Sequence, residues 1–166
     1  LLAANVADTL GGTASLAFWV RTTQTGAATA ATAPGIAGAA GSGGTQWGWL
    51  DESGRLGLSI DNTLVVRTAY ALNDGNWHHV VITRDASTGG TQIYLDGVIS
   101  GSATGVTGVR NKSITSLARI EGAGANAHFA GRLDQIHIFN RVVSSAEVAT
   151  LKTNHAPKCW VLFTVM

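Results

Sequence analysis

The sequence predicts an all-β protein: a two-sheet antiparallel jelly-roll sandwich with one short C-terminal helix. Residues 77–83 read WHHVVIT, an aromatic and β-branched run without glycine or proline, which is typical of a strand. Asp96 and Gly97 lie between two apolar pairs and form a strong hairpin signal, because a type I′ turn needs positive φ at both central positions. Glycine is abundant, at 21 of 166 residues, and only 13% of residues are charged, which suits many short strands joined by turns.

Length and charge limit the alternatives. We place residues 1–166 in a single domain whose core runs from 15 to 151, since this length fits one domain. The net charge of +1 gives no electrostatic case for nucleic acid or an anionic membrane as partner. No apolar stretch reaches the roughly 18–20 residues that span a bilayer. Cys159 is the single cysteine, which excludes an intrachain disulfide and a cysteine-based zinc site.

The N-terminal region is expected to hold one long strand and one long loop. Residues 15–22 form the strand, with three apolar side chains on one face and Trp19 and Arg21 on the other. Residues 23–44 are nearly all alanine, glycine and threonine, and composition alone would make them a flexible linker. A linker would leave a one-strand fragment before it that could not fold alone. A long loop flanking a short strand near 35–38 is therefore the preferred interpretation.

Three further strands are expected before the strand at 77–83. Residues 46–50 and 55–60 form two of them, joined by a four-residue turn at 51–54 that ends in glycine. A turn at 61–62 leads into the third, at 63–68.

The second half of the chain continues the pattern and ends in a helix. We expect strands at 98–102, 116–120 and 130–139, and along the last of these neither face is purely apolar. Residues 144–151 form the helix, because Ser144 and Glu147 make a capping box in which each side chain satisfies a backbone N–H of the first turn.

The apolar tail at 156–166 contains the strand-like run WVLFTV. Being terminal and apolar, it is expected to pair at a sheet edge.

Two blocks of the sequence resemble the laminin-G-like jelly roll of the concanavalin A-like lectin/glucanase superfamily. One is WHHVVITRD with IYLDG, at 77–97, and the other is FAGRLDQIHIFNR at 129–141, which leads into the helix. The resemblance implies a curved sandwich that is mostly extracellular, often a carbohydrate-binding or adhesion module, and often calcium-bound. The family's usual first strand is absent before residue 15. One account is that the tail at 156–166 fills the edge left by that missing strand.

The resemblance also implies a metal site at Asp134. In relatives of this fold an aspartate in the late strand binds a structural calcium together with backbone carbonyls. Aspartate is otherwise disfavoured within a strand, and calcium prefers oxygen ligands. The alternative is that Asp134 pairs with Arg132 or caps a turn.

Two pairs of aromatic or histidine residues are candidates for a binding site. Trp47 and Trp49 are two apart on one strand, so they are expected to share a face and could form a platform for sugar rings. The alternative, which is favoured, is that both fill the core. His78 and His79 are adjacent on a strand and point to opposite faces, so they cannot chelate one metal together.

The acidic residues argue against a glycoside hydrolase. That chemistry needs two carboxylates about 5–5.5 Å apart for retention, or about 6.5–9.5 Å apart for inversion. Glucanases of this fold carry them as Glu-x-Asp-x-x-Glu along one strand, and no such run exists here. The three glutamates, Glu52, Glu121 and Glu147, are expected in a turn, at a strand end and in the helix. We therefore expect no catalytic residue.

The sequence is interpreted as a non-catalytic binding module of a secreted or cell-surface protein, with a glycan or a surface protein as its partner. A structural or assembly domain without a small ligand is the alternative, which the Ala/Gly/Thr-rich loops favour. A glycoside hydrolase is the third hypothesis, and the absence of a carboxylate pair on one strand argues against it.

Overall fold

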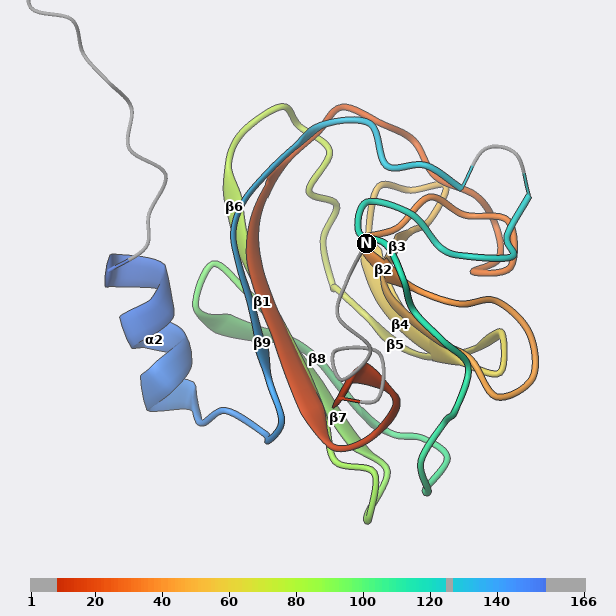
Figure 1. Ribbon diagram of the computed structural model, residues 1–166. Coiled ribbons are helices and arrows are strands. Elements are labelled where there is room, and N and C mark those ends of the chain that lie inside the picture. The colour runs from red at the N-terminus through yellow and green to blue at the C-terminus, as the bar shows by residue number, and fades with distance from the viewer. Residues whose placement is uncertain (1–8, 125–126, 155–166) are drawn as a thin grey trace, which may run out of the picture.

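The computed structural model describes residues 9–124 and 127–154, and Figure 1 shows them as two facing sheets with a helix outside one of them. The five-stranded sheet has the order β8-β7-β6-β1-β9 and the four-stranded sheet the order β2-β3-β4-β5, and all neighbours are antiparallel. The elements are β1 (Ala14–Arg21), β2 (Ala37–Gly38), β3 (Thr45–Leu50), β4 (Leu56–Ile60), β5 (Thr63–Arg67), β6 (His78–Arg84), β7 (Gly90–Leu95), β8 (Val98–Thr104), β9 (Arg132–Phe139) and α2 (Ser145–Asn154). The predicted all-β sandwich with one short C-terminal helix is confirmed.

The hairpin β6–β7 lies in the middle of the larger sheet. The turn that joins β7 to the next strand, β8, has Asp96 at φ 53° and Gly97 at φ 88°, so both central positions adopt the positive φ that the sequence predicted. Val80, Ile82 and Ile93 are fully buried on the side that faces the second sheet.

The core fills the space between the sheets. Phe18 and Val20 of β1 pack there with Trp47 of β3 and Leu58 of β4, and all four are fully buried. Burial of large apolar side chains contributes roughly 1.5–3 kcal/mol each, so this layer provides most of the driving force for folding.

Helix α2 covers the other face of the five-stranded sheet. Val148 of the helix packs on Ala17, Val81 and Tyr94, which point away from the inter-sheet core. Figure 1 shows the helix outside the sheet, and Lys152 donates to the backbone carbonyl of Asp96 at 2.7 Å.

The helix begins with the predicted capping box. The Ser144 N–H donates to Oε2 of Glu147 at 2.8 Å, and the Glu147 N–H donates to Oγ of Ser144 at 3.3 Å. Hydrogen bonds from Arg141 are the largest cause that lowers the pKa of Glu147, to about 2.

The strand predicted at 116–120 is wrong. Leu117 and Arg119 make isolated bridges to Ala37 and His128 in place of a continuous ladder. Ala118 between them has φ 61°, in the left-handed region, which interrupts the extended backbone of a regular strand.

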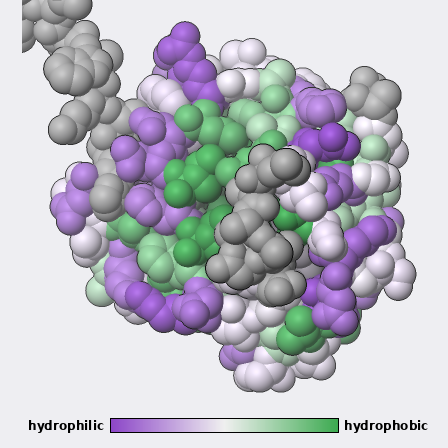
Figure 2. Space-filling view, viewed as in Figure 1, coloured by the Kyte–Doolittle hydropathy of each residue, from purple (hydrophilic) through white to green (hydrophobic). Residues whose placement is uncertain are grey.

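A bulge in β9 explains why its residues did not separate into two faces. Gln135 adopts φ 49°, and the register between β1 and β9 shifts at that point. Leu133 and Ile136 therefore both pack against the core although they are three residues apart. Figure 2 shows hydrophobic residues gathered near the middle of the face seen in Figure 1, between the two sheets.

The long Ala/Gly/Thr-rich segment is a loop around the short strand β2, as predicted. Gly26 donates its N–H to the carbonyl of Asp51 at 3.1 Å, and a Cβ at Gly26 would overlap the carbonyl oxygen of Leu50. The small residues therefore let this loop lie directly on the sheet.

The predicted edge strand at 156–166, including Cys159, lies outside the described residues. In the described part of the chain no helix is long and apolar enough to cross a membrane.

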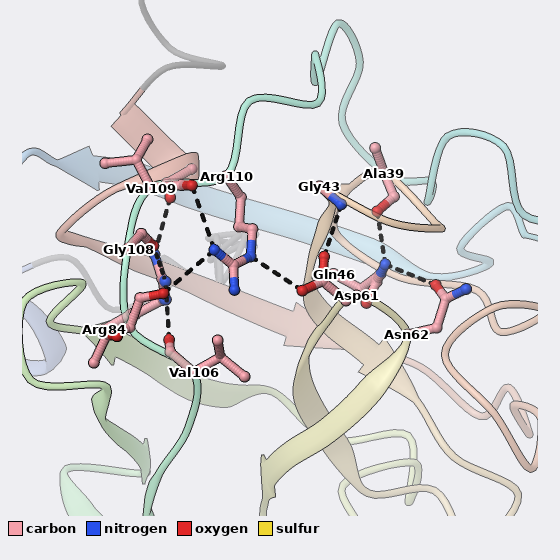
Figure 3. Close-up of polar contacts among 12 residues, drawn as sticks. Ala39, Gly43, Gln46, Asp61, Asn62, Arg84, Val106, Gly108, Val109 and Arg110 are labelled. Atoms are coloured by element: carbon pink, nitrogen blue, oxygen red, sulfur yellow. Dashed lines mark hydrogen bonds and ion pairs between the residues drawn. The ribbon is translucent and has the colours of Figure 1, made fainter.

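A fully buried arginine ties three segments together. Nη1 of Arg84 donates to the carbonyls of Gly11 and Gly12, both at 2.9 Å, and Nη2 donates to those of Gly108 at 2.6 Å and Val106 at 3.3 Å. Figure 3 shows the guanidinium of Arg84 with its bonds to the loop that follows β8. Burial is the main cause that lowers the pKa of Arg84.

Arg110 continues this network toward the four-stranded sheet. Its Nε donates to Oδ2 of Asp61 at 3.2 Å, and Oδ1 of Asp61 accepts the N–H of Gly43 at 2.7 Å, as Figure 3 shows. The first residues of the loop after β8 are thereby fastened both to β6 and to the turn between β4 and β5.

We expect Arg84→Met to lower the free energy of unfolding by about 3 kcal/mol, because it leaves four backbone carbonyls without their donor. Urea unfolding of both proteins measures the loss. The control is Arg141→Gln, which removes an exposed arginine and should cost much less. Equal losses in the two variants would contradict the role given to Arg84.

Candidate functional site

One end of the sandwich brings two long loops together. Arg21, the last residue of β1, pairs with Arg132, the first of β9. The loop that leaves β1 and the loop that enters β9 therefore run side by side across the top of Figure 1.

Side chains of the first loop hold the second in place. Oγ1 of Thr22 donates to the carbonyl of Ala130 at 2.6 Å. The amide of Gln24 donates to the carbonyl of His128 at 3.1 Å and accepts the N–H of Ala130 at 2.8 Å. Asn73 donates to the carbonyl of Gln24 at 3.2 Å and joins the segment before β6 to the pair. These hydrogen bonds fix the position of the two loops relative to each other.

A hollow of about 660 Å³ lies between these loops, and we call it the rim groove. Its lining carries hydroxyl, amide and imidazole groups among small residues. The residues are Gln24, Thr25, Gly26, Ala27, Thr32, Pro34 and His128. Such a surface can both donate and accept hydrogen bonds, and it carries no side chain with a fixed charge.

A third apolar cluster, besides the inter-sheet core and the cluster under helix α2, lies next to the groove and includes its residue Ala27. Ala30, Ala33 and Ile120 pack on the indole of Trp49, on the side of the four-stranded sheet that faces away from the main core. This cluster supports the loops from below.

Trp47 and Trp49 do not form the sugar platform considered from the sequence. Their exposed fractions are 0% and 2%, so neither ring face is open to a ligand. The expectation that they share a face is wrong, because Gly48 has φ 67° and the register shifts between them. Trp47 lies in the inter-sheet core, where its Nε1 donates to the carbonyl of Leu10 at 3.0 Å.

A second, smaller hollow of about 410 Å³ lies next to the rim groove. Two arginines face it, beside small residues of the same loops. Its residues are Arg21, Thr22, Thr23, Gly75, Ala130, Gly131 and Arg132. We call it the arginine hollow.

His78 lies between two carboxylates near the same end. Its Nδ1 is 2.8 Å from Oδ2 of Asp96 and its Nε2 is 3.1 Å from Oδ1 of Asp74. Burial lowers the pKa of His78, but the bonds to Asp96 and Asp74 outweigh it and hold the pKa above its usual value. Hydrogen bonds from Asn76 are the main cause that lowers the pKa of Asp74, to about 2.

The two histidines point to opposite faces of β6 at different depths. His79 is buried and its ring centroid is 5.2 Å from that of Trp19. His78 faces the two aspartates described above, so the pair shares no ligand.

Asp134 lies on β9 opposite Trp19, and its Oδ1 accepts the N–H of the next residue, Gln135, at 2.8 Å. Its carboxylate is the kind of oxygen donor that calcium prefers. Within residues 9–124 and 127–154, however, no three acidic, histidine or cysteine side chains cluster in a way that could hold a metal. A calcium ion at Asp134 would therefore depend on backbone and water oxygens for most of its ligands.

The sequence did not identify the rim groove or the arginine hollow. His128 lies 104 residues after Gln24 in the chain, and neither it nor Gln24 and Thr32 of the first loop belong to a recognisable motif. The available signal was the pair of arginines at corresponding ends of two predicted strands.

Comparison with known proteins places the chain among lectin-like sandwiches. A laminin-G family model, described as the concanavalin A-like lectin/glucanases superfamily, matches residues 2–149. A curated relative is the sushi, von Willebrand factor type A, EGF and pentraxin domain-containing protein 1 of Rattus norvegicus. It is 29% identical over 94 residues, which are 51% of this chain and 3% of that protein. The chain thus spans only a small part of the relative's length.

Two solved structures share the fold. One is domain 4 of an extracellular arabinanase from Geobacillus stearothermophilus, in complex with arabinotriose, with TM-score 0.62, 20% identity and coverage of 87% of this chain and 69% of that one. The other is the CBM40 of Ruminococcus gnavus IT-sialidase bound to alpha2,3 sialyllactose, with TM-score 0.63, 12% identity and coverage of 86% and 84%.

We expect protonated His78 to stabilise the native state. Because its folded-state pKa is raised, the contribution is complete below the unfolded pKa of about 6.5 and is lost as pH rises through the folded-state value. His78→Gln should remove this pH dependence of the unfolding free energy. His128→Gln, which changes a histidine with no carboxylate partner among the described residues, should keep it. A histidine NMR titration in which His78 shows an ordinary or lowered pKa would contradict the assignment.

Proposed function

The chain belongs to the concanavalin A-like lectin/glucanases superfamily, and from this premise we propose that it is a non-catalytic carbohydrate-binding module with its ligand in the rim groove. The observation that carries the proposal is the groove itself, a polar hollow between two loops at one end of the sandwich. Loops held by a rigid scaffold are the usual location of binding residues.

The groove suits a sugar in size and chemistry. A hollow of about 660 Å³ is within the usual range for ligand sites, roughly 300–1,000 Å³. The hydroxyls of Thr25 and Thr32 and the imidazole of His128 can bond to sugar hydroxyls, which are themselves both donors and acceptors. Gln24 already orders the walls through its bonds across the loops, so little ordering remains to be done on binding.

The electrostatics of the carboxylates oppose a hydrolase. The general acid of a glycosidase needs a raised pKa so that it carries a proton at neutral pH. Burial raises the pKa of Asp51, but hydrogen bonds, first those from the backbone N–H groups of Arg55 and Ser53, outweigh it and hold the pKa below its usual value. Burial also raises the pKa of Glu121, and hydrogen bonds from Thr115 and Ser116 hold it below its usual value. Asp74 is lowered to about 2. Among the described carboxyl groups with a shifted pKa, each is therefore held ionised.

An adhesion or assembly domain is the second candidate. Tyr70 is 75% exposed, Val98 70% and Ile99 51%, and the N–H of Ala69 donates to the carbonyl of Ser100, which places Tyr70 beside strand β8. A group of exposed apolar side chains at a sheet edge favours a protein partner.

We further propose that the protein is secreted or displayed on a cell surface. The support is the fold it shares with a domain of an extracellular arabinanase and with a sialidase binding module.

A glycan array followed by calorimetry on the strongest ligand tests the proposed function. We expect an oligosaccharide to bind and His128→Ala or Thr32→Val to weaken it about fivefold each, the effect of one lost hydrogen bond. Thr104→Val, on an exposed position of β8 far from the groove, is the control. No bound glycan on the array would overturn the carbohydrate proposal and favour the protein partner.

Calcium is proposed as a structural ion on the basis of Asp134. If calcium binds only the folded protein, a hundredfold excess over its dissociation constant raises the unfolding free energy by about 2.7 kcal/mol. We expect a rise in Tm with calcium that chelator reverses and Asp134→Asn abolishes. A Tm that does not respond to calcium would contradict it.

A further inference from the structure

Two arginines oppose one another where β1 ends and β9 begins. Arg21 and Arg132 are direct cross-strand partners, and both are exposed. Like charges in this arrangement repel each other and destabilise a strand pair. The fold therefore keeps an unfavourable pair at the mouth of the arginine hollow.

The hydrogen-bonding groups of these arginines are largely unused. Nε of Arg21 donates to the carbonyl of Gly75 at 2.6 Å, which orients its guanidinium, and its Nη groups donate to no other described residue. The side chain of Arg132, whose backbone pairs with that of Arg21, makes no hydrogen bond or ion pair within the described residues. Four other arginines in that part of the chain form ion pairs: Arg55, Arg67, Arg110 and Arg141.

The nearby carboxylates do not neutralise the pair. Asp74 uses Oδ1 for the N–H of Asn76 and for His78, and Oδ2 for the side-chain amide of Asn76. Asp134, two residues after Arg132, accepts the N–H of Gln135 and lies in no ion pair with either arginine. The positive charge at the hollow therefore faces solvent.

The arginine hollow adjoins the rim groove. Thr22 and Ala130 line the hollow, and Ala130 is bonded to Gln24, which lines the groove. A molecule of several sugar units in the groove could thus extend into the hollow.

We propose that Arg21 and Arg132 form an anion subsite that binds the acidic group of a glycan held in the rim groove. A carboxylate or a sulfate has the chemistry required, because its oxygens can accept from two guanidinium groups at once and relieve their repulsion. This inference rests on the proposed function and deepens it, since it assigns the ligand class as an acidic glycan.

The test compares the full chain and its variants on an array of neutral, carboxylated and sulfated oligosaccharides, with dissociation constants measured for the ligands that bind. We expect acidic oligosaccharides to bind more tightly than neutral ones of the same length, and more weakly as salt is raised. Arg21→Gln and Arg132→Gln should each cost at least about tenfold in affinity for the acidic ligand. Arg132→Lys should lose part of this, since lysine keeps the charge without the planar fork.

The control is Arg141→Gln, which removes the same charge beyond the other end of β9 and should leave affinity unchanged. Carboxylated and sulfated ligands are separate arms, so the array also identifies which acidic group is taken. Thermal unfolding checks that the variants fold, and relief of the repulsion should leave the Tm of Arg132→Gln equal or higher.

Neutral glycans that bind as tightly as acidic ones, with no effect of the arginine variants, would overturn the anion subsite and leave the proposed function standing. Equal loss in Arg141→Gln would overturn it too, because it would show a general charge effect. An array with no bound glycan would overturn both proposals.

Discussion

The buried guanidinium of Arg84 is the contact on which the arrangement of this domain depends. It joins the segment before β1, the end of β6 and the loop after β8 by donating to four backbone carbonyls. The chain has few charged residues and many irregular segments, and carbonyls in such segments need donors if they are to be buried. One planar side chain with several donors satisfies carbonyls from two distant loops at once. The rim at the opposite end uses neutral groups, chiefly the amide of Gln24, for the same purpose.

Much of the fold could be predicted from sequence because its signals are local. The turn at Asp96 and Gly97, the capping box of Ser144 and Glu147 and the strand at 77–83 each depend on residues close in the chain. The errors came where backbone conformation departs from regular geometry through long-range contacts. Alanine and glutamine rarely adopt a positive φ, yet Ala118 and Gln135 both do. For this reason the strand expected at 116–120 is wrong, and the apolar residues of β9 do not alternate along the strand.

The candidate site was less predictable for the same reason. Trp47 and Trp49 looked like neighbours on one face, and only the bulge at Gly48 separates them. The rim groove is made by loops whose alanines and threonines carry no motif, and it exists because β1 and β9 are neighbours in space although more than a hundred residues separate them in sequence. Asp134, by contrast, was proposed as a calcium ligand from a family resemblance, and calcium binding at this residue stays a prediction.

The bonds that Gln24 makes across the two loops have a consequence for the kinetics of recognition. If the rim groove binds a glycan as proposed, walls that are already ordered need no closing step, so the association rate is governed by diffusion and orientation and should vary little among related sugars. Discrimination between ligands would then be found in how long each one stays. A module of this kind releases a poor ligand quickly and retains a good one, which suits repeated sampling along a polymer.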